Sequence, residues 1–466
     1  MVDYERLTAI EHGILQLEGP HAPLHVSSVQ LFEAGPLLAD RGGVDIERIR
    51  DAVRARIGDL PRYRQVLLQL PLETQPIWVD AKEVDLEFHV RHMCLPRPGS
   101  ERQLKRMVGR VLAEPLNRAR PLWDLSVIEG AGEGVVALVS RVHGCLLDAG
   151  GHAALPGALL THVPSDKPGP FALWRPHPRP HRAELAVDEL RELAQWPSTL
   201  WRGLRRLSER PNLAGRVRAI GQALGATLHA TTETPLDGPV GRLRRVDWCR
   251  IDRPRLDAVT ARLGASLEEI VLTVSAGALG RFFAGTRGID VRRFDLRALV
   301  PSDGRGEGEG GAWIVPLPVG EADPVRRLAA IRKVMRSGGL RDQARGTSWL
   351  AEFGGHVPEA LFGAAARWLS RRHPFNLVIA PQHEEPGERY LLGARRIETF
   401  LFEPIRDGMS IGLAAAEEPA GLCWGITADW DAHPDLHELA LALEASFAEL
   451  EAPLAALAAP DVERRA

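Results

Sequence analysis

A short apolar run that leads directly into polar residues and glycines constrains this chain most. Gly134–Ser140 reads GVVALVS, which is typical of a buried strand. The stretch Val142–His152 reads VHGCLLDAGGH, and its Ala-Gly-Gly end permits a tight turn of the backbone. We therefore expect His143 and Asp148 just past the end of a strand, at the mouth of whatever that strand helps to build. This placement suggests acid–base chemistry.

Helix and strand patterns surround this stretch on both sides. In the first half, apolar residues at helical spacing predict helices at Leu7–Leu17, Asp45–Ile57 and Glu101–Leu112. Alternating or apolar runs predict strands at His25–Phe32, Gln75–Val79, Asp85–Val90 and Arg120–Glu129, the last forming a hairpin with the strand before the motif.

The second half repeats the mixture of helices and strands. Helices are predicted at Pro254–Leu263, Ser266–Phe283, Pro324–Arg336 and His433–Ala452. Strands are predicted at Asp295–Pro301, Trp313–Pro318, Phe375–Ile379, Arg395–Phe402, Met409–Ala415 and Gly421–Thr427. Mixed elements on both sides of a linker predict a two-domain α/β (α+β) architecture.

The linker is expected at residues 164–210, between an N-terminal domain at 1–163 and a C-terminal domain at 211–466. It starts with the Pro-rich, basic stretch Pro164–Pro180. Leu193, Trp196, Leu200, Leu204 and Leu207 then recur at helical spacing among many arginines. Two interpretations stay open: a basic amphipathic helix on an anionic membrane, or a helix docked on the second domain with a solvated Arg face.

The charge balance, the cysteine spacing and the apolar content limit the classes of function to expect. With 58 Lys+Arg against 61 Asp+Glu, the net charge of −3 gives no reason to expect a nucleic-acid partner. The four cysteines are far apart and the histidines are scattered, so neither a disulfide framework nor a metal site is indicated. The N-terminus has no apolar signal core, and no stretch approaches 18 apolar residues. We expect a cytoplasmic protein, with peripheral contact to the inner face of the plasma membrane or to lipid droplets left open.

Several long blocks carry a family resemblance over nearly the whole chain. They are LTAIEHGILQLEGPHAPLHVSSVQLFE, RPLWDLSVIEG, GASLEEIVLTVSAGALGRFF, NLVIAP and ITADWDAHPDLHELALALE. In these blocks the chain resembles the bacterial wax ester synthase/diacylglycerol acyltransferase (WS/DGAT) family. The resemblance implies two chloramphenicol-acetyltransferase-like, CoA-dependent acyltransferase domains around a tunnel. Acyl-CoA would enter this tunnel as a substrate rather than a cofactor, and a fatty alcohol or diacylglycerol would accept the acyl group.

The chain departs from the family at the residue that does the chemistry. The family motif reads His-His-x-x-x-Asp-Gly, and its second His is the base that takes the proton of the acceptor hydroxyl. On that motif, His143 is the first His, Gly144 stands at the base position, and Asp148 and Ala149 stand at the Asp and Gly positions. Loss of a positioned base typically costs about 10²–10⁴ in rate.

Further positions around the cleft also differ from the family. Its Asn-Asp pair corresponds to Glu268–Glu269, and Gly412 and Ala312 stand where two asparagines are expected. Asn376 and Pro381 of the NLVIAP segment are kept, as is a second Asp-Gly pair, which begins at Asp407. The resemblance thus predicts substrate contacts from Trp123, Cys145, Glu268, Glu269, Asn376 and Asp407.

Each candidate has a structural alternative. Trp123 suits core packing at the domain junction, and Glu268 and Glu269 suit first-turn helix acids better than a catalytic carboxylate pair. Asp148 suits a structural carboxylate, and His152 an ordinary packed or surface His, although His143, His152 and Cys145 are the candidates for a substitute base or nucleophile.

Three functions remain open at this point. The chain is an O-acyltransferase with a substitute base, an acyl or lipid-binding module without turnover, or a partner of an active homologue. The last two make it a pseudoenzyme, and the third requires a homo- or hetero-oligomer.

Overall fold

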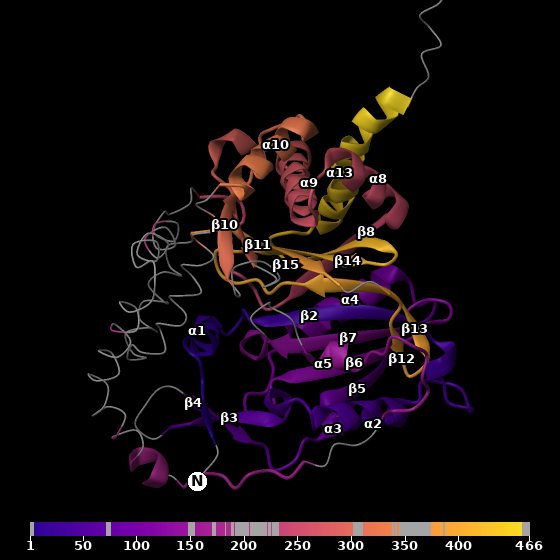
Figure 1. Cartoon of the computed structure of the whole chain (residues 1–466), viewed down its shortest axis with the longest axis vertical. Helices are drawn as coiled ribbons and strands as arrows, with labels where there is room; N and C mark the ends of the chain where they lie inside the picture. Colours follow the sequence, from indigo (N-terminus) through magenta and orange to yellow (C-terminus); the bar gives the residue numbers. More distant parts are fainter. Residues whose placement is uncertain are drawn as a thin grey trace, which may run out of the picture.

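The computed structural model describes residues 4–70, 76–147, 154–169, 174–181, 183–187, 233–301, 311–337, 374–384 and 387–458, with residues 191, 205, 221, 225, 340 and 343. Two large mixed sheets lie one above the other, with helices above the upper sheet (Figure 1). The linker region of residues 193–218, with the predicted Arg-rich helix, lies almost entirely outside the described residues.

The first sheet contains the strand that precedes the motif. Its order is β12-β13-β2-β7-β6-β5, which are Tyr390–Leu391, Ala394–Phe402, His25–Glu33, Val135–His143, Trp123–Glu129 and Val90–Cys94. The β6–β7 hairpin is antiparallel as predicted, whereas β5 pairs parallel to β6 and forms the edge. Alternate residues of these strands pack against helix α2 (Ile46–Ile57), which begins at its predicted N-cap Asp45.

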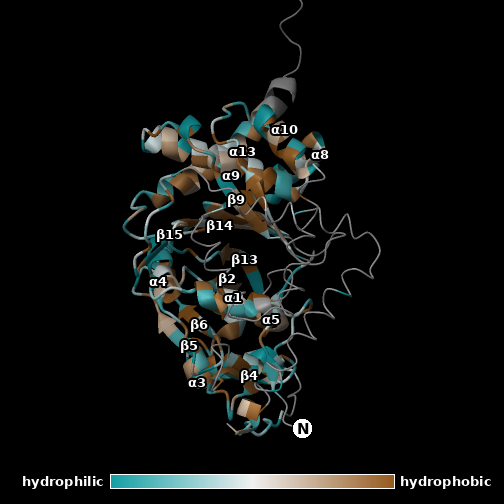
Figure 2. Cartoon of the chain, turned by 90° about the vertical axis from the view of Figure 1, so that its left-hand side faces the viewer, coloured by the Kyte–Doolittle hydropathy of each residue, from teal (hydrophilic) through white to brown (hydrophobic). Residues whose placement is uncertain are grey.

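The second sheet belongs to the other half of the chain. Its order is β10-β9-β11-β14-β15-β8, which are Ala312–Pro316, Arg297–Pro301, Leu377–His383, Ile411–Glu418, Gly421–Asp429 and Arg244–Asp252. Its covering helices are α8, α9, α10 and α13, which are Arg253–Leu263, Leu267–Arg281, Pro324–Met335 and Leu436–Ala458. Figure 2 shows the apolar sheet beneath these helices. Nearly all of α9 is buried, which explains its weak amphipathic pattern.

Smaller elements accompany the two large sheets in the described part of the chain. A three-stranded sheet has the order β1-β4-β3, which are Glu5–Arg6, Pro76–Asp80 and Gln65–Gln69. Further α-helices are α1 (Ala9–Leu17), α3 (Leu86–His89), α4 (Glu101–Ala113) and α5 (Ala154–Ala158). Short 3₁₀ or π turns are η1 to η5, which are Gly35–Leu37, Pro61–Arg64, Gly144–Leu146, Phe282–Thr286 and Val291–Arg293.

The prediction of a strand at Asp85–Val90 was wrong. Asp85 accepts a hydrogen bond from the backbone N–H of Phe88 at 3.1 Å and caps the short helix α3, and β5 begins only at Val90. A local capping bond thus overrides the alternating pattern, as Asp at an N-cap commonly does. Strands β3 and β8 were not predicted.

Two close contacts join the sheets. Helix α4 packs on β8, and a Cβ added at Gly109 would lie 2.6 Å from the carbonyl oxygen of Arg244. Lys105 of α4 also reaches Asp247 at 2.6 Å. On the other side, a Cβ at Gly425 of β15 would lie 1.9 Å from the carbonyl oxygen of Leu401 of β13. Glycine is required at both positions because backbone meets backbone there.

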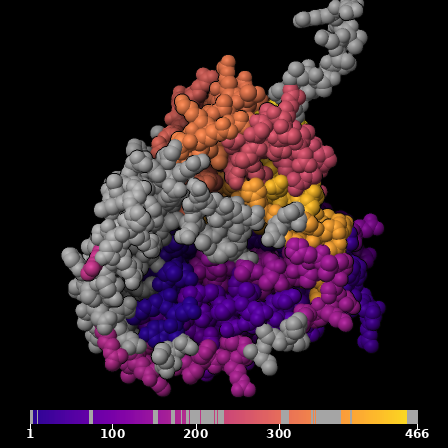
Figure 3. Space-filling model, viewed as in Figure 1, coloured from indigo at the N-terminus to yellow at the C-terminus, as the bar shows by residue number. Residues whose placement is uncertain are grey.

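Strand β13 comes from the second half of the chain but completes the first sheet. It pairs antiparallel with β2, with Phe402 opposite Ser27. The space-filling view shows the yellow and orange C-terminal segment directly against the purple first half (Figure 3). An apolar cluster fills the space between the sheets: Val29, Leu104, Val108, Val111, Leu112, Ile128, Ala137, Val139, Val246, Trp248, Phe400, Phe402 and Cys423. Among the described residues, no single helix is long and apolar enough to cross a membrane.

Candidate active site

Strand β7 carries the motif to the end of the first sheet. The strand runs through His143 itself, opposite His25 of β2, rather than stopping at Ser140 as expected. Gly144 then begins the turn η3. His143 is therefore held by the sheet and not by a loop, which fixes the direction of its ring. Asp148 and His152, the other two titratable residues of the motif, lie outside the described residues.

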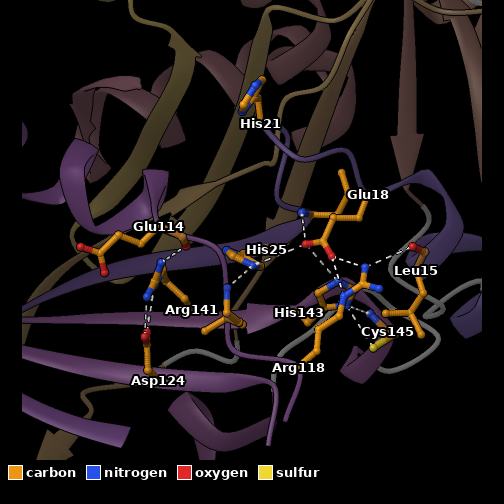
Figure 4. Close-up of polar contacts among 12 residues, drawn as sticks. Leu15, Glu18, His21, His25, Glu114, Arg118, Asp124, Arg141, His143 and Cys145 are labelled. Carbon is orange, nitrogen blue, oxygen red and sulfur yellow. Dashed lines mark hydrogen bonds and ion pairs between the residues drawn. The ribbon is translucent and has the colours of Figure 1, made fainter. Parts of the chain in front are cut away.

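The His143 ring is buried and both of its nitrogens face protein groups (Figure 4). The backbone N–H of Cys145 donates to Nδ1 at 3.2 Å, and the Cys145 sulfur lies 3.0 Å from the same atom. Nε2 lies 3.5 Å from a carboxylate oxygen of Glu18. Because Nδ1 accepts a hydrogen bond, a neutral ring carries its proton on Nε2, toward Glu18. No ring lone pair is left to take a proton from a substrate in this arrangement.

Glu18, which follows helix α1, gathers the polar groups around His143. It pairs with Arg118, accepts the Leu24 N–H at 3.3 Å, and lies 3.8 Å from His25. Burial tends to raise the pKa of Glu18, but the hydrogen bonds and charges of His143 and Arg118 outweigh it and lower the pKa to about 2. Glu18 is thus an anion that orients His143.

Burial and the nearby Arg141 charge lower the pKa of His25 well below its usual range. The His25 ring is therefore neutral, and it accepts the Leu116 N–H at 3.4 Å. Arg141, two residues before His143, donates to Asp124 at 2.9 Å and to the carbonyls of Val111 and Glu114 at the end of α4. These contacts tie the end of β7 to α4 (Figure 4).

The space beside Gly144 is filled. A Cβ added there would lie 3.2 Å from the Ile14 side chain and 3.3 Å from the Leu24 carbonyl oxygen. The Gly144 N–H donates to that same carbonyl at 2.8 Å. Helix α1 therefore packs against the position where the family has its base, and even a Cβ there needs its neighbours to move by a few tenths of an ångström.

The Cys145 sulfur lies 3.0 Å from His143 Nδ1, but the lone pair of that nitrogen already accepts the Cys145 N–H, so His143 is not free to activate the thiol. The thiol is also buried, and burial raises its pKa. A raised pKa opposes the thiolate that nucleophilic attack requires. Cys145, the middle residue of η3, is thus a packing residue in the core of the first sheet.

Trp123 is fully buried in the core of the first sheet rather than at the junction between the sheets. Its indole N–H donates to the Tyr63 carbonyl at 2.7 Å, and its ring stacks on His89 with centroids 4.4 Å apart. These are the contacts of a packing residue with its polar atom satisfied.

Glu268 and Glu269 have separate roles at the start of α9. Glu269 forms the predicted capping box with Ser266 and pairs with Arg332 at 3.0 Å. Glu268 instead accepts from His383 at 3.0 Å, and the other ring nitrogen of His383 lies 2.9 Å from Glu417. Hydrogen bonds to these carboxylates raise the pKa of His383 to about 9. His383 is thus a cation, which sequence reasoning did not single out.

Asn376 and Asp407 hold a backbone segment. Asn376 is buried and donates to Asp237 at 3.2 Å, while its oxygen accepts the Arg297 N–H at 3.0 Å. Asp407 accepts the Val240 N–H at 2.8 Å. Together they fix the segment around residues 234–240, part of the block TPLDGPVG, beside the second sheet.

Gly412, which stands at a family Asn position, faces Glu403. A Cβ at Gly412 would lie 3.1 Å from the Cβ of Glu403. Glu403 follows β13 directly, and burial raises its pKa to about 7. Ala312, at the other family Asn position, lies at the start of β10.

A cavity of about 340 Å³ opens between the first sheet and the end of β11. Ser28 and Ser140 share its floor and are hydrogen-bonded at 2.8 Å. His383 and Thr399 line it too, as does α5 through Pro156. Ser140 precedes His143 by three residues on the same strand, so the cavity and the motif share β7. The sheet order brings these residues together, because β2, β7 and β13 are neighbours.

The chain has two layered sheets, and the first of them includes β13 from the second half of the chain. This is the architecture of the two-domain CoA-dependent acyltransferases. The wax ester synthase/diacylglycerol acyltransferase from Marinobacter aquaeolei VT8 has the same fold, with a TM-score of 0.66 and 21% identity over 97% of this chain and 100% of that one. The starter condensation domain of rhizomide synthetase, solved with C8-CoA and Leu-SNAC, also matches, with a TM-score of 0.56 and 12% identity over 97% and 94%.

Sequence comparison places the chain within one family of that class. The WS/DGAT catalytic domain matches residues 7–271 and the WS/DGAT C-terminal domain matches residues 310–451. The Mycobacterium tuberculosis protein Rv1760, provisionally named a diacylglycerol O-acyltransferase, is 28% identical over 96% of this chain and 90% of its own length. This chain belongs to the WS/DGAT family, as its sequence blocks predict.

Proposed function

We propose that this chain moves a long-chain acyl group from acyl-CoA to the hydroxyl of a diacylglycerol or fatty alcohol, and does so slowly. One observation carries the proposal: the end of β7 is held firmly by Glu18, Arg118 and Arg141, yet Gly144 stands where the base is needed. The family scaffold is kept and its proton acceptor is missing, which corresponds to a rate about 10²–10⁴ below that of a member with a His there.

The reaction still balances without a protein base. The acceptor oxygen attacks the thioester carbonyl carbon, the C–S bond breaks, and CoA leaves as a thiolate. The hydroxyl proton passes to water or to the departing thiolate. Holding the two substrates together supplies the remaining acceleration. We further propose that the cavity lined by Ser28, Ser140 and Thr399 receives the polar end of one substrate, because its walls offer hydroxyl groups.

A second candidate is an acyl or lipid-binding module without turnover. The contact of Ile14 with the Cβ position of Gly144 favours it, since helix α1 crowds the position at which the family has its base. In that case the chain binds acyl-CoA for storage or presentation.

The deciding experiment compares four forms of the full chain: natural, Gly144→His, Ile14→Ala, and the double variant. Transfer from labelled palmitoyl-CoA to dioleoylglycerol or hexadecanol is measured beside acyl-CoA binding by calorimetry. We expect slow transfer by the natural chain and a gain of about 100-fold or more in the double variant, where the base has room. The Ile14→Ala variant shows the effect on transfer of the added space at Gly144 without a new base.

The other outcomes separate the candidates. Acyl-CoA binding with no transfer by the natural chain supports the lipid-binding module. Absence of acyl-CoA binding overturns both candidates and leaves a role as a partner of an active homologue. Fast transfer by the natural chain that is lost in His143→Ala or His152→Ala overturns the missing-base interpretation.

For localisation we propose a cytoplasmic protein that touches the inner face of the plasma membrane or a lipid droplet. The Arg-rich apolar repeat at residues 193–218 supports this proposal, since such segments bind anionic lipid surfaces. Co-sedimentation of the full chain with anionic and neutral vesicles, at low and high salt, tests it. Binding that is equal on both vesicle types and insensitive to salt contradicts it.

A further inference from the structure

Three ligand-type side chains meet at the edge of the first sheet, away from the motif. His92 and Cys94 are two residues apart on edge strand β5, and Glu129 lies directly opposite Cys94 on β6. Residues at i and i+2 of a strand, and directly paired residues on a neighbour, point to the same face. The sequence alone shows no metal spacing because the ligands come from two strands that pair only in the fold.

The three ligand atoms form a compact triangle. His92 Nε2 lies 3.1 Å from Glu129 Oε2, and the Cys94 sulfur lies 3.9 Å from each of these two atoms. The centre of this triangle, in the plane of the three atoms, is about 2.1 Å from each of them, close to Zn–N and Zn–O bond lengths and slightly short of a Zn–S bond. The atoms therefore surround an ion of this size with only a small outward shift of the sulfur.

The surroundings orient these ligands and leave them accessible. Glu129 also accepts the backbone N–H of Val44 at 3.3 Å through the same oxygen, which fixes its carboxylate. The side chains of His92 and Glu129 are 31% and 32% exposed. Because β5 is the outer strand of its sheet, a metal ion reaches the three atoms from solvent.

We propose that His92, Cys94 and Glu129 form a binding site for a borderline divalent transition metal such as Zn²⁺. A thiolate, an imidazole and a carboxylate are the donor set that Zn²⁺ takes, and three protein ligands leave the fourth tetrahedral position to water. On binding, the Cys94 thiol loses its proton to solvent and the sulfur bonds the metal. Because the thiol must lose its proton before the sulfur bonds the metal, affinity is expected to increase with pH.

The site is separate from the proposed acyl-transfer site. Glu129 pairs with Val136 near the start of β7, whereas His143 is at the far end of that strand. Seven residues of extended strand separate the two positions, which is about 23 Å. A metal here joins the edge strand β5 to β6 (Figure 1) and is expected to act on stability rather than on transfer.

The first test uses the natural protein, reduced and stripped with a chelator. Cys94 is exposed and the other three cysteines are buried, so a thiol reagent modifies one thiol per native chain. We expect one equivalent of Zn²⁺ to protect that thiol. We also expect Co²⁺ to give a thiolate-to-metal absorption band that Zn²⁺ abolishes. An unprotected thiol together with no Co²⁺ band overturns the proposal.

Variants then identify the ligands. Cys94→Ser should remove the Co²⁺–thiolate band, and His92→Gln and Glu129→Gln should each weaken Zn²⁺ binding about 10-fold or more. His437→Gln is the matched control, since His437 also pairs with a carboxylate, Asp247 at 3.0 Å. Equal Zn²⁺ affinity in the natural chain and the three ligand variants contradicts the site. An upward shift of Tm with Zn²⁺ in the natural chain and the control alone supports it.

Discussion

His383 lies between two carboxylates, and this arrangement makes its contribution to stability depend on pH. Hydrogen bonds to Glu268 and Glu417 raise the pKa of His383 from 6.5 to about 9. A pKa raised by folding means that the stabilisation is complete below about pH 6.5 and is lost as the pH rises through about 9. The pKa of Glu268 is lowered from 4.5 to about 2, so its own contribution is complete above pH 4.5.

We therefore predict that His383→Gln costs most between pH 4.5 and 6.5. The expected loss of unfolding free energy at pH 6 is roughly 1–2 kcal/mol, because the partly exposed ring is screened by solvent, and it shrinks at pH 10. Denaturant unfolding at the two pH values measures it. His437→Gln, on an exposed ring, is the control. A cost that is the same at pH 6 and pH 10 would show that the ion pairs do not stabilise the fold.

Glu403 should behave in the opposite way when it is replaced. Burial raises its pKa from 4.5 to about 7, so its favourable contribution is present below pH 4.5 and is lost as the pH rises through 7. We predict that Glu403→Gln stabilises the chain by about 1–3 kcal/mol at pH 8 and has little effect at pH 4. Thermal unfolding at both pH values measures this, with the exposed Glu83→Gln as the control. Destabilisation at pH 8 would instead reveal a partner for the ionised Glu403.

At the scale of elements, β13 can cross close to β15 only because Gly425 has no side chain. A Cβ at Gly425 would lie 1.9 Å from the Leu401 carbonyl oxygen, so Gly425→Ala forces the two strands apart. We predict a loss of roughly 1–3 kcal/mol or more in unfolding free energy. Gly285→Ala, with no atom within 4 Å of the added Cβ, is the matched control. Denaturant unfolding of both variants gives the comparison, and equal stabilities would mean that the crossing relaxes freely.

The sequence predicts elements better than it predicts their partners. Periodicity places the helix at Asp45–Ile57 and the strands at His25–Phe32 and Gly421–Thr427 within a residue or two of their observed bounds. It misses β8, whose basic and apolar residues mix without a clear alternation. A buried strand with many polar residues shows no clear alternating pattern in the sequence, because its charged side chains are paired with residues far away in the chain.

The contacts within the candidate site could not be predicted from the sequence for the same reason. Glu18 and His143 are more than a hundred residues apart in the sequence, and no local sequence pattern around either residue predicts their contact. The departure at Gly144 was visible by resemblance, but the contact of Ile14 with that position depends on how α1 folds back on η3. Local sequence thus specifies which groups are present, and the sheet order specifies which of them meet.

At the scale of the whole molecule, the exchanged strand couples the two halves. Strands β12 and β13 come after residue 389, yet they extend the first sheet beyond β2. Without them, β2 becomes an edge that exposes backbone groups along Ser27–Phe32. Unpaired strand edges of this kind drive aggregation. A cut at the predicted domain boundary therefore removes part of the first sheet.

We predict that the fragment of residues 1–163 aggregates, whereas the same fragment with residues 388–404 joined by a flexible linker is more soluble and unfolds cooperatively. The matched control joins residues 388–404 in scrambled order, which keeps length and composition but loses the pairing of Phe402 with Ser27. Gel filtration and thermal unfolding distinguish the forms. A monomeric fragment 1–163 with a sharp transition would show that β13 is an addition to a complete domain. Rescue by the native segment alone would show that the first domain is built from both ends of the chain.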